Sequence, residues 1–146
     1  FLVGVDDFLH QWVADDIIEC ADVAATYGVM LAIQNHADLL QTAEDVHLIM
    51  NKVRHPWVGL MSDIGSFRGR DPLQEIKDTI GYAITWQIKE KMRINGQEQE
   101  TDIPRVIDII RQSDYRGYLP IETLGEGDPK VKVKKLFDKV KKALKK

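Results

Sequence analysis

The 146-residue sequence has one cysteine, no long apolar run and no low-complexity segment. The single Cys20, which we interpret as a small buried residue of a helix, excludes an internal disulfide and fits a reducing compartment. We therefore expect a cytoplasmic protein. No apolar stretch approaches the roughly 20 residues of a membrane-spanning helix, so no membrane partner is expected. Without any linker, residues 1–146 are predicted to form a single domain.

The start of the chain also lacks several features. Residues 1–5 carry no charged leader and no cleavage site, so they do not read as a signal peptide. There is no initiator methionine, and the first predicted element is a helix. These two features favour a fragment of a longer protein.

Positive charge is scarce outside the C-terminus. Residues 130–146 carry nine lysines and one aspartate, a net charge of +8, whereas residues 1–129 carry −11. Such a tail can bind nucleic acid or an anionic membrane. Apolar residues nevertheless repeat through it at helical spacing: Val133, Leu136, Phe137, Val140 and Leu144. We interpret residues 128–146 as a lysine-rich terminal helix that docks on the domain, and we expect no nucleic-acid partner.

The sequence does contain a regular alternation of helix-like and strand-like segments. A helix is predicted over residues 7–27, with a buried stripe at Leu9, Val13, Ile17, Cys20 and Ala24. Four apolar runs follow, at residues 29–33, 58–62, 83–88 and 118–121. Further helices are predicted to begin near Thr42, Asp71, Asp102 and Asp128, and residues 93–100 read as a polar loop.

This order, a helix and then four strand–helix units, predicts right-handed crossovers and a parallel sheet. The expected class is therefore α/β, of the parallel (β/α) TIM-barrel type. Only about four of the eight units of such a barrel are present, because the full fold takes about 250 residues. The chain is either a half-barrel or the C-terminal part of a full barrel.

Each predicted strand ends in polar residues, at the edge where such barrels carry their active sites. These residues are Gln34, Asn35 and His36, Ser62 and Asp63, Gln87 and Lys89, and Glu122. Two carboxylates and two amide oxygens suit a divalent cation such as Mg, Mn or Co, which can polarise a sugar carbonyl and stabilise an enediolate. Lys89 and Arg93 could bind an anionic group of a substrate. The alternative is that the acidic residues only cap the helices that follow.

Four segments, residues 32–36, 62–68, 86–90 and 115–125, resemble in order and spacing the C-terminal half of the xylose isomerase-like sugar phosphate isomerase/epimerase family of TIM barrels. The resemblance implies a divalent metal (Mn, Mg or Co), which the family commonly holds with Glu, Asp, His and Glu. The matching positions here are Gln34, Asp63, Gln87 and Glu122. Ser66 matches a substrate-binding histidine, and Arg93 an arginine that contacts substrate.

Two matched positions depart from the family pattern. Gln87 in place of His can still coordinate through its amide oxygen, but Gln34 in place of Glu cannot act as a base near pH 7. Glu122 is then the expected catalytic base, with His36 as a second candidate.

The resemblance implies a metal-dependent sugar or sugar-phosphate isomerase/epimerase that works through an enediolate. The alternative is a non-catalytic carbohydrate-binding member of the same fold. A DNA-repair role, as in endonuclease IV of the same superfamily, is disfavoured by the acidic body of the chain.

Four parallel strands cannot close a barrel whose interior is packed by side chains from all eight. The inward faces and the two outer strand edges would remain exposed. We therefore expect either a homodimer that closes a two-fold barrel or a fragment whose other half is missing.

Overall fold

The computed structural model describes residues 3–36 and 39–145. Phe1 and Leu2, on which the signal-peptide expectation partly rests, and Lys146 of the terminal helix lie outside the described residues. None of the helices in the described part is long and apolar enough to cross a membrane.

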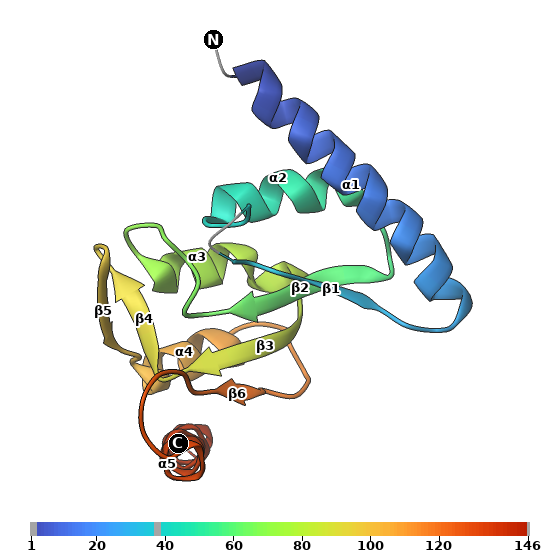
Figure 1. The fold of residues 1–146 in the computed structure, drawn as a ribbon. Helices are drawn as coiled ribbons and strands as arrows, with labels where there is room; N and C mark the ends of the chain where they lie inside the picture. Colours follow the sequence, from blue (N-terminus) through green and yellow to red (C-terminus); the bar gives the residue numbers. More distant parts are fainter. Residues whose placement is uncertain (1–2, 37–38, 146) are drawn as a thin grey trace.

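The chain folds as a parallel sheet covered by a row of helices (Figure 1). In chain order the elements are α1 Val3–Thr26, β1 Leu31–Gln34, α2 Ala43–Val53, β2 Val58–Asp63, α3 Pro72–Thr79, the 3-10 helix η1 Ile80–Tyr82, β3 Ala83–Lys89, β4 Lys91–Ile94, β5 Gln97–Glu100, α4 Ile103–Arg111, β6 Ile121–Glu122 and α5 Pro129–Leu144.

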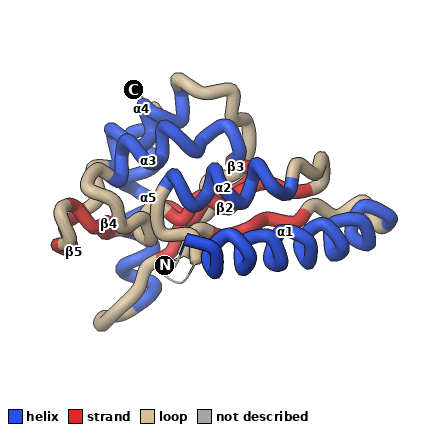
Figure 2. Tube along the Cα trace, turned by 90° about the horizontal axis from the view of Figure 1, so that it is seen from above, coloured by secondary structure: helices blue, strands red, loops and turns tan. Residues whose placement is uncertain are grey.

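The main sheet has the strand order β1-β2-β3-β6, and every neighbouring pair is parallel. The five α-helices contact one another in sequence order, α1 with α2 and so on to α5. Figure 2 shows α2, α3 and α4 along one side of the sheet, with α1 alongside α2. This is the curved wall of a partial (β/α) barrel, so the predicted fold class is confirmed.

The core fills the space between the sheet and the helices. Leu60 of β2 and both Trp86 and Ile88 of β3 are fully buried there. Gln87 and Lys89, which alternate with them along β3, therefore face the opposite side of the sheet. The Trp86 ring contacts the Tyr115 ring edge-on, with the ring centroids 5.7 Å apart.

The predicted helix starts are confirmed, because each carries a side-chain cap. Thr42 forms a capping box with Asp45 at the start of α2. Asp71, Asp102 and Asp128 each accept backbone N–H bonds at the starts of α3, α4 and α5, and each of these helices has a proline in its first turn.

The buried stripe predicted for the first helix is only partly confirmed. Val13 and Ile17 are half-buried and pack against the core, but Leu9 and Cys20 are exposed, and the fully buried positions are Ala14 and Ala21. The buried face of α1 therefore consists of fully buried small residues together with larger, half-buried apolar ones. An apolar surface that includes Phe8 and Trp12, whose rings lie 4.3 Å apart, is left on the outside of α1.

The polar loop predicted over residues 93–100 is instead an antiparallel hairpin, β4–β5. Its turn is Asn95-Gly96, where both residues have positive φ, at 52° and 78°. This conformation is the one that asparagine and glycine favour in two-residue hairpins. The hairpin rises directly from the end of β3, so it projects beside the strand ends (Figure 1).

The last strand and the last helix also differ from the prediction. The strand covers only Ile121–Glu122, and Tyr118 is exposed, with its carbonyl oxygen accepting a 2.6 Å hydrogen bond from the Tyr115 hydroxyl. In α5 the buried residues are Leu136, Val140 and Ala143, whereas Phe137 and Leu144 are half-exposed. The helix docks as expected, but on a face rotated toward Ala143.

Candidate active site

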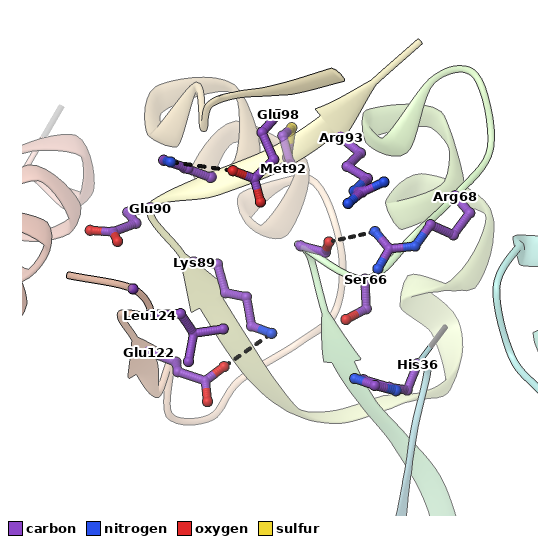
Figure 3. A pocket seen from close by; sticks show the side chains of 13 residues that line it. His36, Ser66, Arg68, Lys89, Glu90, Met92, Arg93, Glu98, Glu122 and Leu124 are labelled. Atoms are coloured by element: carbon purple, nitrogen blue, oxygen red, sulfur yellow. Dashed lines mark hydrogen bonds and ion pairs between the residues drawn. The ribbon is translucent and has the colours of Figure 1, made fainter. Parts of the chain in front are cut away.

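A cavity of about 280 Å³ opens at the carboxyl ends of the strands (Figure 3). Its walls come from the residues that follow β1 and β2, from the ends of β3 and β6, and from the hairpin β4–β5. His36, Ser66, Lys89, Arg93 and Glu122, all expected in the site, line it. The volume is at the small end of the roughly 300–1,000 Å³ typical of small-molecule sites.

Asp63 is the buried centre of the cluster beneath this cavity. Its side chain has no solvent exposure, and all its interactions are with donors. Oδ1 accepts the Gly65 N–H at 3.0 Å, and Oδ2 accepts from the Ser66 hydroxyl at 2.7 Å and from Gln34 Nε2 at 3.0 Å. The third donor to Oδ2 is the Lys89 ammonium, at 2.7 Å. These bonds hold the carboxylate in one orientation.

Lys89 bridges the two carboxylates of the site. Its Nζ lies 2.7 Å from Asp63 Oδ2 and 3.0 Å from Glu122 Oε2, so those two oxygens are at most about 5.7 Å apart. The Lys89 side chain is 13% exposed and that of Glu122 is 34% exposed. Burial acts to lower the pKa of Lys89, but hydrogen bonds to Asp63 and Glu122 outweigh it, and the pKa is raised.

The amides of β1 and β3 extend the same network. Gln34 Nε2 donates to Gln87 Oε1 at 2.8 Å as well as to Asp63. Asn35, which is fully buried, holds the backbone of Asp63 through two bonds: its Nδ2 donates to the Asp63 carbonyl at 2.9 Å, and its Oδ1 accepts the Asp63 N–H at 2.8 Å. The end of β2 is therefore fixed to β1 by side chains beyond the strand pairing.

Gly65 allows Lys89 to reach its position. A Cβ atom at residue 65 would lie 2.6 Å from Lys89 Cδ and 3.0 Å from the Lys91 carbonyl oxygen. Either contact is shorter than normal packing permits, so a larger residue would displace the lysine side chain. Glycine is required here by close approach.

The cavity is lined by charged side chains of both signs. Arg68 and Arg93 lie on one side of it, and Lys89 and Glu122 lie on the other (Figure 3). Lys91 lines it as well and pairs with Glu98 across the hairpin at 3.3 Å. His36 is exposed and points toward the cavity from the end of β1.

The sequence pattern assigns no role in the site to three residues of this region: Gly65, Arg68 and Lys91. One signal was available, because the Asn95-Gly96 turn indicates the hairpin that carries Lys91. Nothing in the local pattern indicates that Lys89 lies over Gly65, because the contact joins the end of β3 to the loop that follows β2.

The residues expected to hold a divalent metal are not arranged as a coordination sphere. Gln34 directs its NH₂ group, a donor, at Asp63 and Gln87, and the Gln87 oxygen is used in accepting that bond. The position between Asp63 and Glu122 is taken by the Lys89 ammonium. Within residues 3–36 and 39–145, no group of three or more His, Cys, Asp or Glu side chains could hold a metal ion. The oxygen atoms of this site therefore fit an ammonium ion and do not fit a divalent metal.

Comparison with known proteins assigns the family. The model of the xylose isomerase-like TIM barrel matches residues 7–144, so the chain belongs to this family. No curated protein sequence matches it significantly.

Solved structures with the same fold are distant in sequence. The apo form of the 3-keto-D-glucoside 4-epimerase YcjR from E. coli is 15% identical, with a TM-score of 0.70 over 94% of this chain and 54% of that one. A xylose isomerase domain protein from Planctomyces limnophilus is 15% identical, with a TM-score of 0.73 over 90% and 51%. The IolI protein, whose structure contains a bound zinc atom, is 20% identical, with a TM-score of 0.67 over 90% and 53%. The chain spans about half the length of these structures.

Proposed function

We propose that this chain carries the catalytic half of a carbohydrate isomerase or epimerase that works through an enediolate. The observation that carries the proposal is the adjacent Lys89 ammonium and Glu122 carboxylate, 3.0 Å apart in a 280 Å³ cavity at the strand ends. A carboxylate beside a fixed cation is what proton abstraction next to a carbonyl requires. Family membership, and neighbours whose names include a sugar epimerase, support the same class.

The reaction needs no oxidant or co-reactant. Glu122 takes the proton from the carbon next to the substrate carbonyl, and the C–H electron pair forms a C=C bond while the carbonyl electrons move to oxygen. The resulting oxyanion is stabilised by the positive charge beside Glu122. Return of the proton to the same carbon from the other side gives the epimer, and its return to the former carbonyl carbon, with a hydroxyl proton transferred between the oxygens, gives the isomer.

The other cavity residues have supporting roles in this proposal. Ser66 and Arg93 contact the substrate, and the two arginines that line the cavity, Arg93 and Arg68, favour a substrate with a phosphate or another anionic group. His36, at the edge of the cavity, is the candidate for the second proton transfer. A cytoplasmic location, expected from the single Cys20, belongs to the proposal as well.

The resemblance implies a divalent metal (Mn, Mg or Co), but the bonds of Gln34 and Gln87 and the position of the Lys89 ammonium do not fit one, so the proposed reaction contains no metal-dependent step. The zinc atom in the IolI structure is a property of that protein. In this chain the question is decided by elemental analysis of the purified protein, which is considered further below.

The test is a screen for exchange of solvent deuterium into ketoses and ketose phosphates, followed by mass spectrometry. Glu122→Gln should lower the exchange rate by about 10²–10⁴-fold, because an amide cannot accept the proton. Glu19→Gln, an exposed change on α1, is the matched control and should leave the rate unchanged. An unaltered rate in Glu122→Gln contradicts the assignment of the base.

A non-catalytic carbohydrate-binding protein is the second candidate, favoured by the amide at Gln34 where the family commonly has a carboxylate. In that case the wild-type protein binds a sugar, as calorimetry would show, but exchanges no deuterium. Gln34→Glu would then be the variant in which exchange is gained.

A further inference from the structure

The Lys89 ammonium lies at the centre of the polar cluster because Lys89 belongs to β3, the strand between β2 and β6. β3 pairs with β2 on one side and with β6 on the other. Lys89, at the end of β3, therefore has Asp63 of β2 on one side and Glu122 of β6 on the other, and its Nζ contacts both, at 2.7 and 3.0 Å. Each neighbouring strand contributes one acidic group to a shared cation.

Two features keep the ammonium at this point. The stem of Lys89 crosses Gly65 at a distance that leaves no room for a Cβ atom, so its path is built into the backbone. Asp63 is held on its other sides by Gly65, Ser66 and Gln34, which leaves its Oδ2 facing Nζ. The pair is thus assembled by its surroundings, in contrast to the exposed Lys91–Glu98 pair of the hairpin.

A divalent ion would compete with this ammonium for the same place. An ion bound to Asp63 Oδ2 at about 2.0–2.6 Å would lie within about 5.3 Å of Nζ, which is itself 2.7 Å from that oxygen. Two cations so close together in a buried site repel each other. Lys89 would have to leave Asp63 before a metal could bind.

We propose that Lys89 is a built-in cation that takes the place of a divalent metal in this site. An ammonium has three N–H donors. Two serve Asp63 and Glu122, and among the described residues no side chain uses the third, while Lys89 itself lines the cavity. The third N–H donates to the carbonyl oxygen of the substrate and stabilises the oxyanion formed when the neighbouring carbon loses its proton. This catalytic role rests on the function proposed above, whereas the exclusion of metal does not.

Metal binding by the wild-type protein is the first test, because it does not depend on activity. Metal-free protein is titrated with Mn²⁺, Co²⁺ and Zn²⁺ by isothermal titration calorimetry, and its melting temperature is followed at each concentration. We expect no specific binding, no rise in melting temperature, and far less than one ion per chain by elemental analysis. Stoichiometric binding at micromolar concentration overturns the proposal.

The variant Lys89→Met tests whether the charge of Lys89 is what prevents metal binding. Methionine keeps most of the length of the side chain but removes the charge, leaving two carboxylates within about 5.7 Å. We expect this variant to gain affinity for Mn²⁺ or Co²⁺, with a melting temperature that rises when the ion is added. Lys77→Met, an exposed change on α3, is the matched control and should gain nothing. A folded Lys89→Met that gains no affinity overturns the proposal, and if it does not fold, the wild-type titration still decides.

Chelation separates this proposal from the proposed function. Deuterium exchange by the wild-type protein should keep its rate in EDTA, whereas Lys89→Met should lose about 10²–10³-fold, the usual effect of removing one oxyanion donor. Loss of deuterium exchange on addition of EDTA overturns the proposal that Lys89 takes the place of a metal. If no sugar exchanges with or without metal, the proposed function fails, and the titrations alone decide the role of Lys89.

Discussion

The stability of the Lys89→Met variant can be predicted from the contacts of Asp63. Removing one partner of a buried ion pair costs about 3–5 kcal/mol, because the other charge is left uncompensated. Asp63 is fully buried but keeps its bonds from Gly65, Ser66 and Gln34. We therefore expect the free energy of unfolding to fall by about 3 kcal/mol, the lower end of this range.

Urea and thermal unfolding, followed by circular dichroism, measure this loss. For a chain of this size, about 3 kcal/mol corresponds to a melting temperature lower by about 6–12 °C. Lys91→Met is the control for stability, because its partner is Glu98 and the two side chains are 56% and 58% exposed. That change should cost less than about 0.5 kcal/mol. Equal losses in the two variants would refute the view that burial gives the Lys89 pair its importance.

Three further predictions follow from other contacts. Gly65→Ala should cost about 1–3 kcal/mol and slow deuterium exchange, because the new Cβ displaces Lys89; Gly81→Ala, with nothing within 4 Å of its Cβ, should do neither. Burial raises the pKa of Glu75, with Asp45, Asp78 and Asp71 adding to it against a hydrogen bond from the Ala43 N–H. The pKa of Glu75 in the folded protein therefore exceeds its unfolded value of about 4.3. As pH rises from the unfolded to the folded pKa, the free energy of unfolding of the wild type should fall relative to that of Glu75→Gln, and above the folded pKa the difference should stay level. Urea titrations at a series of pH values measure this. Light scattering tests barrel closure: we expect a dimer, or association with a missing half, and a monodisperse monomer of 16.7 kDa with a cooperative melt would contradict it.

The fold was predictable because its signals are local. Capping residues at Thr42, Asp71, Asp102 and Asp128 act within one helical turn, and alternation along β3 separates Trp86 from Gln87. The parallel order then follows from the succession of strands and helices. The hairpin has an equally local signal, the Asn95-Gly96 pair at its turn.

The face that each outer helix buries was less predictable. In α1 the predicted stripe included Leu9 and Cys20, which are exposed, whereas Ala14 and Ala21, outside that stripe, are fully buried. The periodicity of a helix shows that a face exists, whereas close packing between helices decides which side is used.

The site was predictable as a group of residues but not as an arrangement. Polar strand ends identify Asp63, Lys89 and Glu122 as neighbours, since parallel strands end at one edge of the sheet. The role of Lys89 depends on the length of its side chain and on the absence of a side chain at Gly65, in the loop after β2. Spacing along the chain contains neither piece of information.

The terminal helix gives the cavity a dependence on ionic strength. Lys132 of α5 pairs with Glu90 at 2.9 Å, and Lys139 pairs with Glu100 at 3.2 Å; these two glutamates stand at the two bases of the hairpin β4–β5. The lysine-rich helix thus pairs with two acidic residues of the body of its own chain. Because the pairs are partly exposed, dissolved salt screens them. Concentrated salt should therefore weaken the contacts that hold the hairpin in the cavity wall before it unfolds the sheet. The affinity for substrate should then fall at a lower salt concentration than the melting temperature does.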